Sequence, residues 1–124
     1  MASYPNDPTV TVVLGVANSD GTFTGVISGT STVMDPGQRD TLSVAVIGNG
    51  TITGGTLVLE EAYQVPGTTY AGTWSQLLSI SATALSGGAQ QVTHLVPSSL
   101  VSVRARITSS ITGGGGVTVV CKEQ

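Results

Sequence analysis

Apolar and polar residues alternate with a period of two along most of this chain. The alternation is clearest in residues 100–108, where the apolar side chains share one face and the polar ones share the other: Val101, Val103, Ala105 and Ile107 against Ser102, Arg104 and Arg106. A period of two places successive side chains on opposite faces, so it predicts a half-buried β-strand. The same pattern predicts strands over residues 9–17, 41–48, 55–62, 73–81 and 117–121, with weaker ones over 22–28 and 90–96.

The alternation also predicts which side chains of each strand lie together on one face. The expected apolar faces are Val10, Val12, Leu14 and Val16; Leu42, Val44 and Val46; Leu57 and Leu59; and Val117, Val119 and Cys121. Over residues 73–81 one face is expected to carry Trp74, Gln76, Leu78 and Ile80. In each strand we expect one apolar face to pack inward and the Ser and Thr face to meet water.

Clusters of Gly, Pro, Asn and Asp separate these runs at intervals of about 8–15 residues, as turns do between short strands. No stretch of ten or more residues shows the 3.6-residue apolar period of an amphipathic helix. The chain is therefore predicted to be all-β, a single antiparallel β-sandwich or jelly roll of about eight strands. We place this domain over residues 9–124, after an N-terminal arm over residues 1–8. A small closed barrel is the alternative.

The composition narrows the function classes. Only 9% of the residues are charged, against about 25% in an average globular domain. Four basic and seven acidic residues give a net charge of −3, which argues against nucleic acid as a partner. With one histidine and one cysteine, a single chain can form neither an internal disulfide nor a multi-histidine metal site. We expect no metal, no cofactor and no enzymatic activity.

The sequence also predicts where the protein is made. Residues 1–8 are polar and lack the basic and apolar regions of a secretory signal. No apolar run approaches the ~20 residues that span a bilayer. We expect synthesis in a cytoplasm and no membrane partner.

The most concentrated charge feature is the pair Arg104 and Arg106, two of only four basic residues. On one face of a strand they could bind carboxylates of a partner through their guanidinium groups. The alternative is a set of cross-strand salt bridges, for instance with Glu60. Glu60 and Glu61 are adjacent and point to opposite faces, so they are not expected to act as a catalytic carboxylate pair.

Other candidates have structural interpretations that we favour. His94 is expected on a polar strand face or at an interface, and Cys121 is expected to be a buried, inert thiol. Trp74 with Tyr63 and Tyr70 could form a sugar-stacking platform, but a core position for Trp74 is the favoured reading. Loop residues Asp20, Asp35 and Asp40 could ligate calcium, yet they do not form a calcium-loop motif.

Four segments carry a resemblance to a known class of proteins. They are GGTLVLEEA at residues 54–62, GTWSQL at 72–77, VSVRARIT at 101–108 and GGVTVV at 115–120. This succession resembles small β-sandwich virion proteins of tailed bacteriophages, over about residues 41–121. The resemblance implies a capsid decoration, or cement, protein that binds the major capsid protein on the head surface, commonly as a homotrimer. It implies no catalytic residues.

From these observations we expect a structural virion protein located on the capsid surface. The alternative is a carbohydrate- or host-surface-binding module of a phage tail or fibre, with a glycan as partner. Small sandwiches have edge strands that natural monomers blunt with charged residues, lysine above all. This chain has one lysine, Lys122. We therefore expect a homo-oligomer, with Arg104 and Arg106 as the candidate partner contact.

Overall fold

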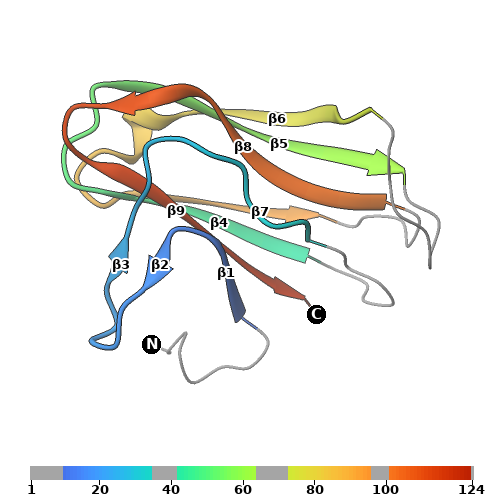
Figure 1. Cartoon of the computed structure of the whole chain (residues 1–124), viewed down its shortest axis with the longest axis horizontal. Helices are drawn as coiled ribbons and strands as arrows, with labels where there is room; N and C mark the ends of the chain where they lie inside the picture. Colours follow the sequence, from blue (N-terminus) through green and yellow to red (C-terminus); the bar gives the residue numbers. More distant parts are fainter. Residues whose placement is uncertain (1–9, 35–41, 64–72, 96–100, 124) are drawn as a thin grey trace.

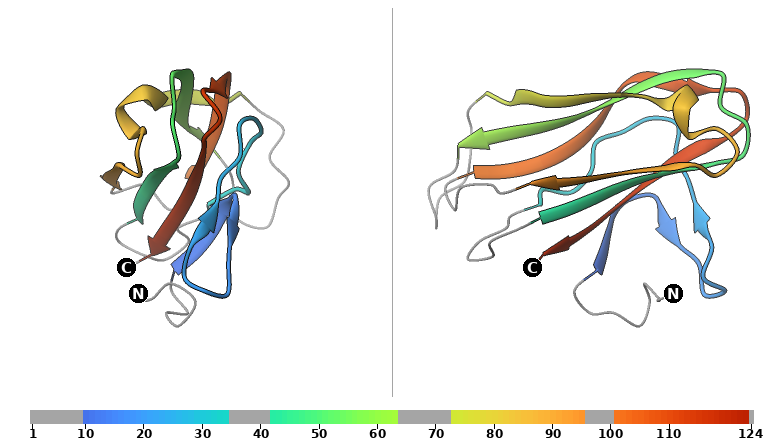
Figure 2. Two further views of the ribbon diagram at one scale, coloured as in Figure 1. Left: turned by 90° about the vertical axis from the view of Figure 1, so that its left-hand side faces the viewer. Right: turned by 180° about the vertical axis from the view of Figure 1, so that it is seen from behind.

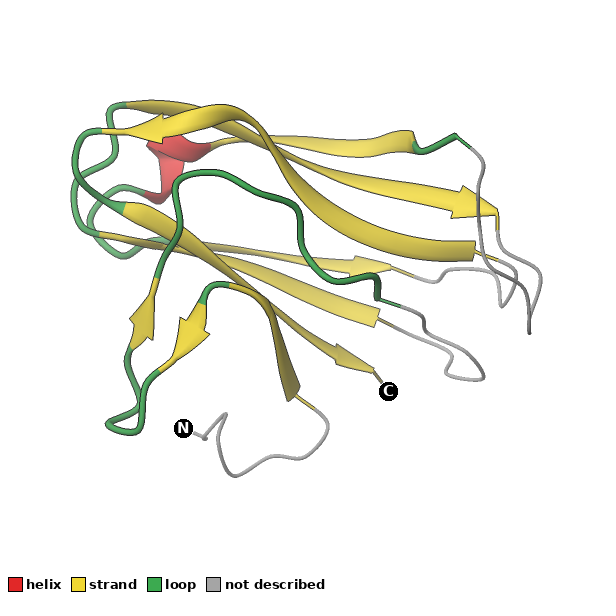
Figure 3. Ribbon diagram, viewed as in Figure 1, coloured by secondary structure: helices red, strands yellow, loops and turns green. Residues whose placement is uncertain are grey.

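The computed structural model describes residues 10–34, 42–63, 73–95 and 101–123, which form an all-β fold (Figures 1 and 3). The elements are β1 (Val10–Leu14), β2 (Val16–Ala17), β3 (Phe23–Thr24), β4 (Leu42–Asn49), β5 (Gly54–Tyr63), β6 (Ser75–Ser81), the 3-10 helix η2 (Ala82–Leu85), β7 (Gln90–Leu95), β8 (Val101–Thr112) and β9 (Gly116–Glu123). The prediction of an antiparallel sandwich is confirmed. The predicted arm over residues 1–8 lies outside the described residues.

The strands form two facing layers (Figure 1). One is a four-stranded sheet in the order β1-β9-β4-β7, and the other is a three-stranded sheet in the order β6-β5-β8. Each pairing within these sheets is antiparallel. Strands β2 and β3 pair with each other in a short hairpin beside the four-stranded sheet.

The core lies between the two sheets and uses most of the predicted apolar faces. Its buried residues include Leu42, Val44 and Val46 from β4, Leu57 and Leu59 from β5, Val103 and Ala105 from β8, and Val117, Val119 and Cys121 from β9. A fully buried Val or Leu side chain stabilises the fold by about 1.5–3 kcal/mol. The period-two pattern of these four strands therefore accounts for most of the packed interior.

One side of the sandwich is closed by the segment that follows β3. Val26 forms an isolated antiparallel bridge with Val117 of β9, and Met34 forms another with Val103 of β8. The Met34 amide donates to the Val103 carbonyl at 2.6 Å. This segment covers the outer edge of β8 and links it to the opposite sheet.

The opposite side of the sandwich ends on β6 and β7, which η2 connects (Figure 2). Ala82 and Leu85 of η2 are buried in the core. Gly48 of β4 lies against the backbone of Leu85, and a Cβ atom on Gly48 would collide with the Leu85 carbonyl oxygen. Glycine is required here by the close approach of η2 to β4.

The predicted core face of the first strand is wrong for Val10 and Val12, whereas Leu14 packs against the core as expected. Val13 is its buried residue, whereas Val12 and Val10 are half-buried on the outer face. The register with β9 shifts between Val12 and Leu14, and such a bulge exchanges the two faces of a strand.

The first predicted strand is also divided at Gly15, whose φ of 97° favours glycine, and Val16 beyond it is exposed. Likewise, only Phe23–Thr24 of the weak strand predicted over 22–28 forms β3.

Candidate binding surfaces

The charged cluster lies on the outer face of the three-stranded sheet and centres on Glu60. Arg104 lies directly across from Glu60 in the β5–β8 register, and Arg106 lies across from Val58, diagonal to Glu60. Arg104 donates from Nε to Oε1 of Glu60 at 2.9 Å. Arg106 donates from Nε to Oε1 at 3.1 Å and from Nη2 to Oε2 at 2.9 Å. The cross-strand salt bridges that the sequence suggested are therefore formed.

The environment of Glu60 favours its ionised state. Hydrogen bonds from Arg106 and then Arg104, with the positive charge of both groups, hold the pKa of Glu60 below its ordinary value, although burial opposes this shift. The carboxylate in turn raises the pKa of Arg106. Because two guanidinium groups surround one carboxylate, the cluster has a net charge of +1 on a protein of net charge −3.

The arginines keep capacity for another ligand. The Arg106 side chain is 41% exposed, and that of Arg104 is 25% exposed. The ion pairs with Glu60 use only Nε of Arg104 and Nε and Nη2 of Arg106, so further N–H groups of both remain outside them. Arg104 and Arg106 accordingly stay a predicted partner contact.

Trp74 belongs to this cluster and not to the core. The Arg104 guanidinium carbon lies 4.2 Å from the centroid of the Trp74 ring, within cation–π range. In the β5–β6 register Leu59 faces Leu78, but Glu60 faces Gln76, so Leu77 is an extra residue in β6. This bulge places Trp74 and Gln76 on the outer face, whereas Leu78 and Ile80 face the core. The expectation of one shared face, and of Trp74 in the core, is wrong for this reason.

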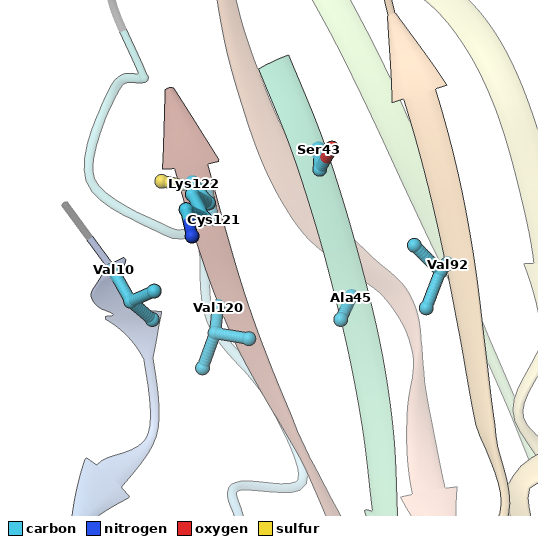
Figure 4. A pocket seen from close by; sticks show the side chains of 7 residues that line it. All are labelled: Val10, Ser43, Ala45, Val92, Val120, Cys121 and Lys122. Carbon is cyan, nitrogen blue, oxygen red and sulfur yellow. The ribbon is translucent and has the colours of Figure 1, made fainter. Parts of the chain in front are cut away.

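A second surface lies on the outer face of the four-stranded sheet. A groove of about 180 Å³ crosses it (Figure 4), lined by Val10, Ser43, Ala45, Val92, Val120, Cys121 and Lys122. The lining comes from all four strands, and most of it is apolar. Lys122 is the one charged residue in this lining.

Ser43 and His94 form a polar contact beside this groove. They face each other in the β4–β7 register, and Ser43 Oγ lies 2.8 Å from Nδ1 of His94. Sequence reasoning did not single out Ser43, and only the strand pairing could have found it. A catalytic serine–histidine pair needs a third group that orients the histidine. Among the described residues, the structure shows no carboxylate bound to His94.

The remaining candidates have structural positions. Cys121 is buried, as predicted, and belongs to the core. Asp20 accepts hydrogen bonds from the Thr22 hydroxyl and from the Thr22 backbone amide, and these bonds lower the pKa of Asp20. Asp35, Asp40 and Tyr70 lie outside the described residues, and so does the side chain of Tyr63. The described residues contain no group of three or more His, Cys, Asp or Glu that could hold a metal ion. None of the described helices is long and apolar enough to cross a membrane.

Comparison with known proteins gives a distant structural likeness. No protein-family model matches the sequence, and no curated protein matches it. Among solved structures, one similar chain is the N-terminal endo-1,4-beta-D-xylanase 10B of Clostridium thermocellum, comprising CBM22-1 and GH10 modules in complex with xylohexaose. The match has 13% sequence identity and a TM-score of 0.48, and covers 93% of this chain. The present chain spans 24% of the length of that protein.

Proposed function

We propose that this chain is a structural, non-catalytic virion protein that decorates the capsid of a tailed bacteriophage. It binds the major capsid protein on the head surface and works there as a homo-oligomer. The observation that carries the proposal is the apolar groove on the four-stranded sheet. The resemblance of the strand sequences to phage virion sandwiches supplies the identity of the partner.

The groove has the character of a protein-binding surface. Its apolar residues Val10, Ala45, Val92 and Val120 come from four adjacent strands, so a rigid sheet holds them in place. Val92 is 48% exposed, so about half of its accessible surface meets water. Apolar surface with few charges is typical of the buried centre of a protein–protein interface. Such a face contributes binding energy when a partner removes it from water.

The direct test is co-sedimentation with undecorated phage heads. The chain should pellet with the heads, and Ala45→Glu should abolish this because it introduces a carboxylate at the middle of the groove. Ser79→Glu is the matched control, since Ser79 is exposed on the other sheet. Thermal unfolding of each variant verifies that it is folded. Failure of the unmodified chain to pellet with heads contradicts the proposal.

Glycan binding is the second candidate, and the position of Trp74 favours it. A half-buried tryptophan lies outside the core and contacts Arg104, which in turn binds the Glu60 carboxylate. An aromatic ring next to hydrogen-bonding groups is the arrangement that sugar-binding sites use. Retention on immobilised oligosaccharides tests this function, and Trp74→Ala should abolish retention. If the protein binds glycans and does not pellet with phage heads, glycan binding would replace capsid decoration as the proposed function.

A further inference from the structure

The open side of the sandwich has an edge strand with no partner among the described residues. Strand β7 is the last strand of the four-stranded sheet, and among the described strands it pairs only with β4 (Figure 2). Its register with β4 is regular from Gln90 to Leu95, without a bulge. A regular free edge presents backbone donors and acceptors that another strand can use.

The backbone groups that face outward can be assigned from one hydrogen bond. Gly48 donates from its amide to the carbonyl of Ala89, the residue that continues the β4–β7 register. Hydrogen-bonded pairs alternate with non-bonded pairs along an antiparallel ladder. The amides and carbonyls of Gln90, Val92 and His94 therefore point away from β4, toward the open side.

The other edges of the two sheets are blunted. Strand β8 is covered by backbone hydrogen bonds with residues 27–34. Strand β6 contains the bulge at Leu77, and β1 is short and bulged. Bulges, charges and prolines are the usual devices that prevent edge pairing, and β7, with the sequence QQVTHL, has none of them.

We propose that β7 pairs with β7 of a second copy of this chain, antiparallel and about a two-fold axis. In the register centred on Val92, each outward-facing residue meets an outward-facing residue. Val92 lies opposite Val92 of the second copy, and Gln90 lies opposite His94 of the second copy. The two-fold axis repeats the Gln90–His94 pair, so the register contains three pairs. They provide six backbone hydrogen bonds, because each hydrogen-bonded pair exchanges two.

The side chains in this register are chemically complementary. Val92 is exposed, and burial against its symmetry mate removes apolar surface from water. A glutamine amide can hydrogen-bond the opposing imidazole. No charged side chain lies on β7 to repel the second copy. The two four-stranded sheets would join into one continuous sheet, and the groove that includes Val92 would run across the junction.

The contact produces a dimer, whereas the sequence resemblance implies a trimer. Analytical ultracentrifugation of the free protein distinguishes the two states, and it requires no capsid or glycan. A negative result therefore counts against the β7 contact alone and leaves capsid binding to its own test.

Val92→Pro is the sharpest variant. Proline removes an N–H that points away from β4, which a folded edge strand tolerates but a dimer contact does not. We expect the dissociation constant of the dimer to rise at least about tenfold, equal to about 1.4 kcal/mol. Val92→Lys keeps the backbone donor, places like charges across the axis and should have the same effect. Val16→Lys is the control for an exposed valine, because Val16 lies on β2, away from this edge.

A disulfide tests the register itself. Val92→Cys should form a covalent dimer under mild oxidation, since hydrogen-bonded antiparallel pairs have Cα atoms about 5.5 Å apart, within disulfide range. Val16→Cys should form no covalent dimer under the same conditions, because Val16 lies on β2, away from the contact. A free protein that is monomeric, or an oligomer that Val92→Pro and Val92→Lys both leave intact, overturns the proposal. Recruitment of a strand from another protein, with no self-association, would also overturn it.

Discussion

Glu60 binds Arg106 through both carboxylate oxygens, with bonds of 3.1 and 2.9 Å, and it binds Arg104 through Oε1 at 2.9 Å. One nearly buried carboxylate thus holds two guanidinium groups that protrude further into solvent. The pairing connects β5 to β8 across their outer face, on the side away from the core. It also keeps the Arg104 guanidinium over the Trp74 ring.

Replacing Glu60 with glutamine should destabilise the fold by about 1–3 kcal/mol. Breaking a fully buried ion pair costs about 3–5 kcal/mol, and the partly exposed arginines recover some of this through hydration. Glu61→Gln is the control, because Glu61 makes none of the ion pairs seen here, and it should cost less than about 0.5 kcal/mol. Urea unfolding measures both values, and equal losses would contradict the structural role of Glu60.

The same carboxylate should make stability depend on acid. The pKa of Glu60 is lower in the folded protein than its ordinary value of 4.5. The unfolded chain therefore binds the proton more tightly, so the contribution of Glu60 to stability is complete above that value and lost as pH falls through the folded pKa. We expect a loss of unfolding free energy below about pH 4.5 that is smaller in Glu60→Gln. An identical pH dependence in the unmodified protein and in Glu60→Gln would contradict this role of the Glu60 carboxylate.

The strand pattern predicts the sandwich because burial follows alternation wherever pairing is regular. Val103 and Ala105 face the core while Arg104 and Arg106 face outward, as their spacing requires. The ion pairs with Glu60 were also among the sequence interpretations. The alternation lies within one strand, and the ion pairs join that strand to its neighbour. Both features therefore follow from the residue types and their spacing in two adjacent strands.

The failures arise at bulges, which change the face of every residue beyond them. A shift between Val12 and Leu14 makes Val13 the core residue of β1. The extra residue Leu77 moves Trp74 to the outer face. A bulge depends on the partner strand and on three-dimensional twist, so one strand's sequence does not reveal it. The contact between Ser43 and His94 likewise needs the register of β4 with β7.

Trp74 provides a direct probe of the cluster, because it is the one tryptophan in the chain. Removing the Arg104 side chain uncovers one face of the ring, so Arg104→Ala should increase quenching of tryptophan fluorescence by acrylamide. Arg106→Ala is the matched control, since the ring contact belongs to Arg104. If acrylamide quenched the tryptophan fluorescence of both variants to the same extent as that of the unmodified protein, the stacking of Arg104 on Trp74 would not exist in solution.

Gly48→Ala should be among the most damaging single substitutions in the described core. Gly48 is buried in β4, and a methyl group there meets the carbonyl of Leu85, a backbone atom that cannot rotate away. Either η2 must shift, which opens the packing around Leu85, or β4 must move within its sheet. Overpacking of this kind costs about 1–3 kcal/mol, and we expect the upper end because backbone meets backbone.

Gly87→Ala separates this collision from a general effect of removing glycine. Its φ of 79° strains an alanine by about 1–2 kcal/mol, but apart from the two adjacent residues no atom lies within 4 Å of the added methyl group. Urea unfolding should therefore show a larger loss for Gly48→Ala than for Gly87→Ala. An equal or smaller loss would mean that η2 does not pack this closely on β4 and that Leu85 is anchored less tightly than the structure indicates.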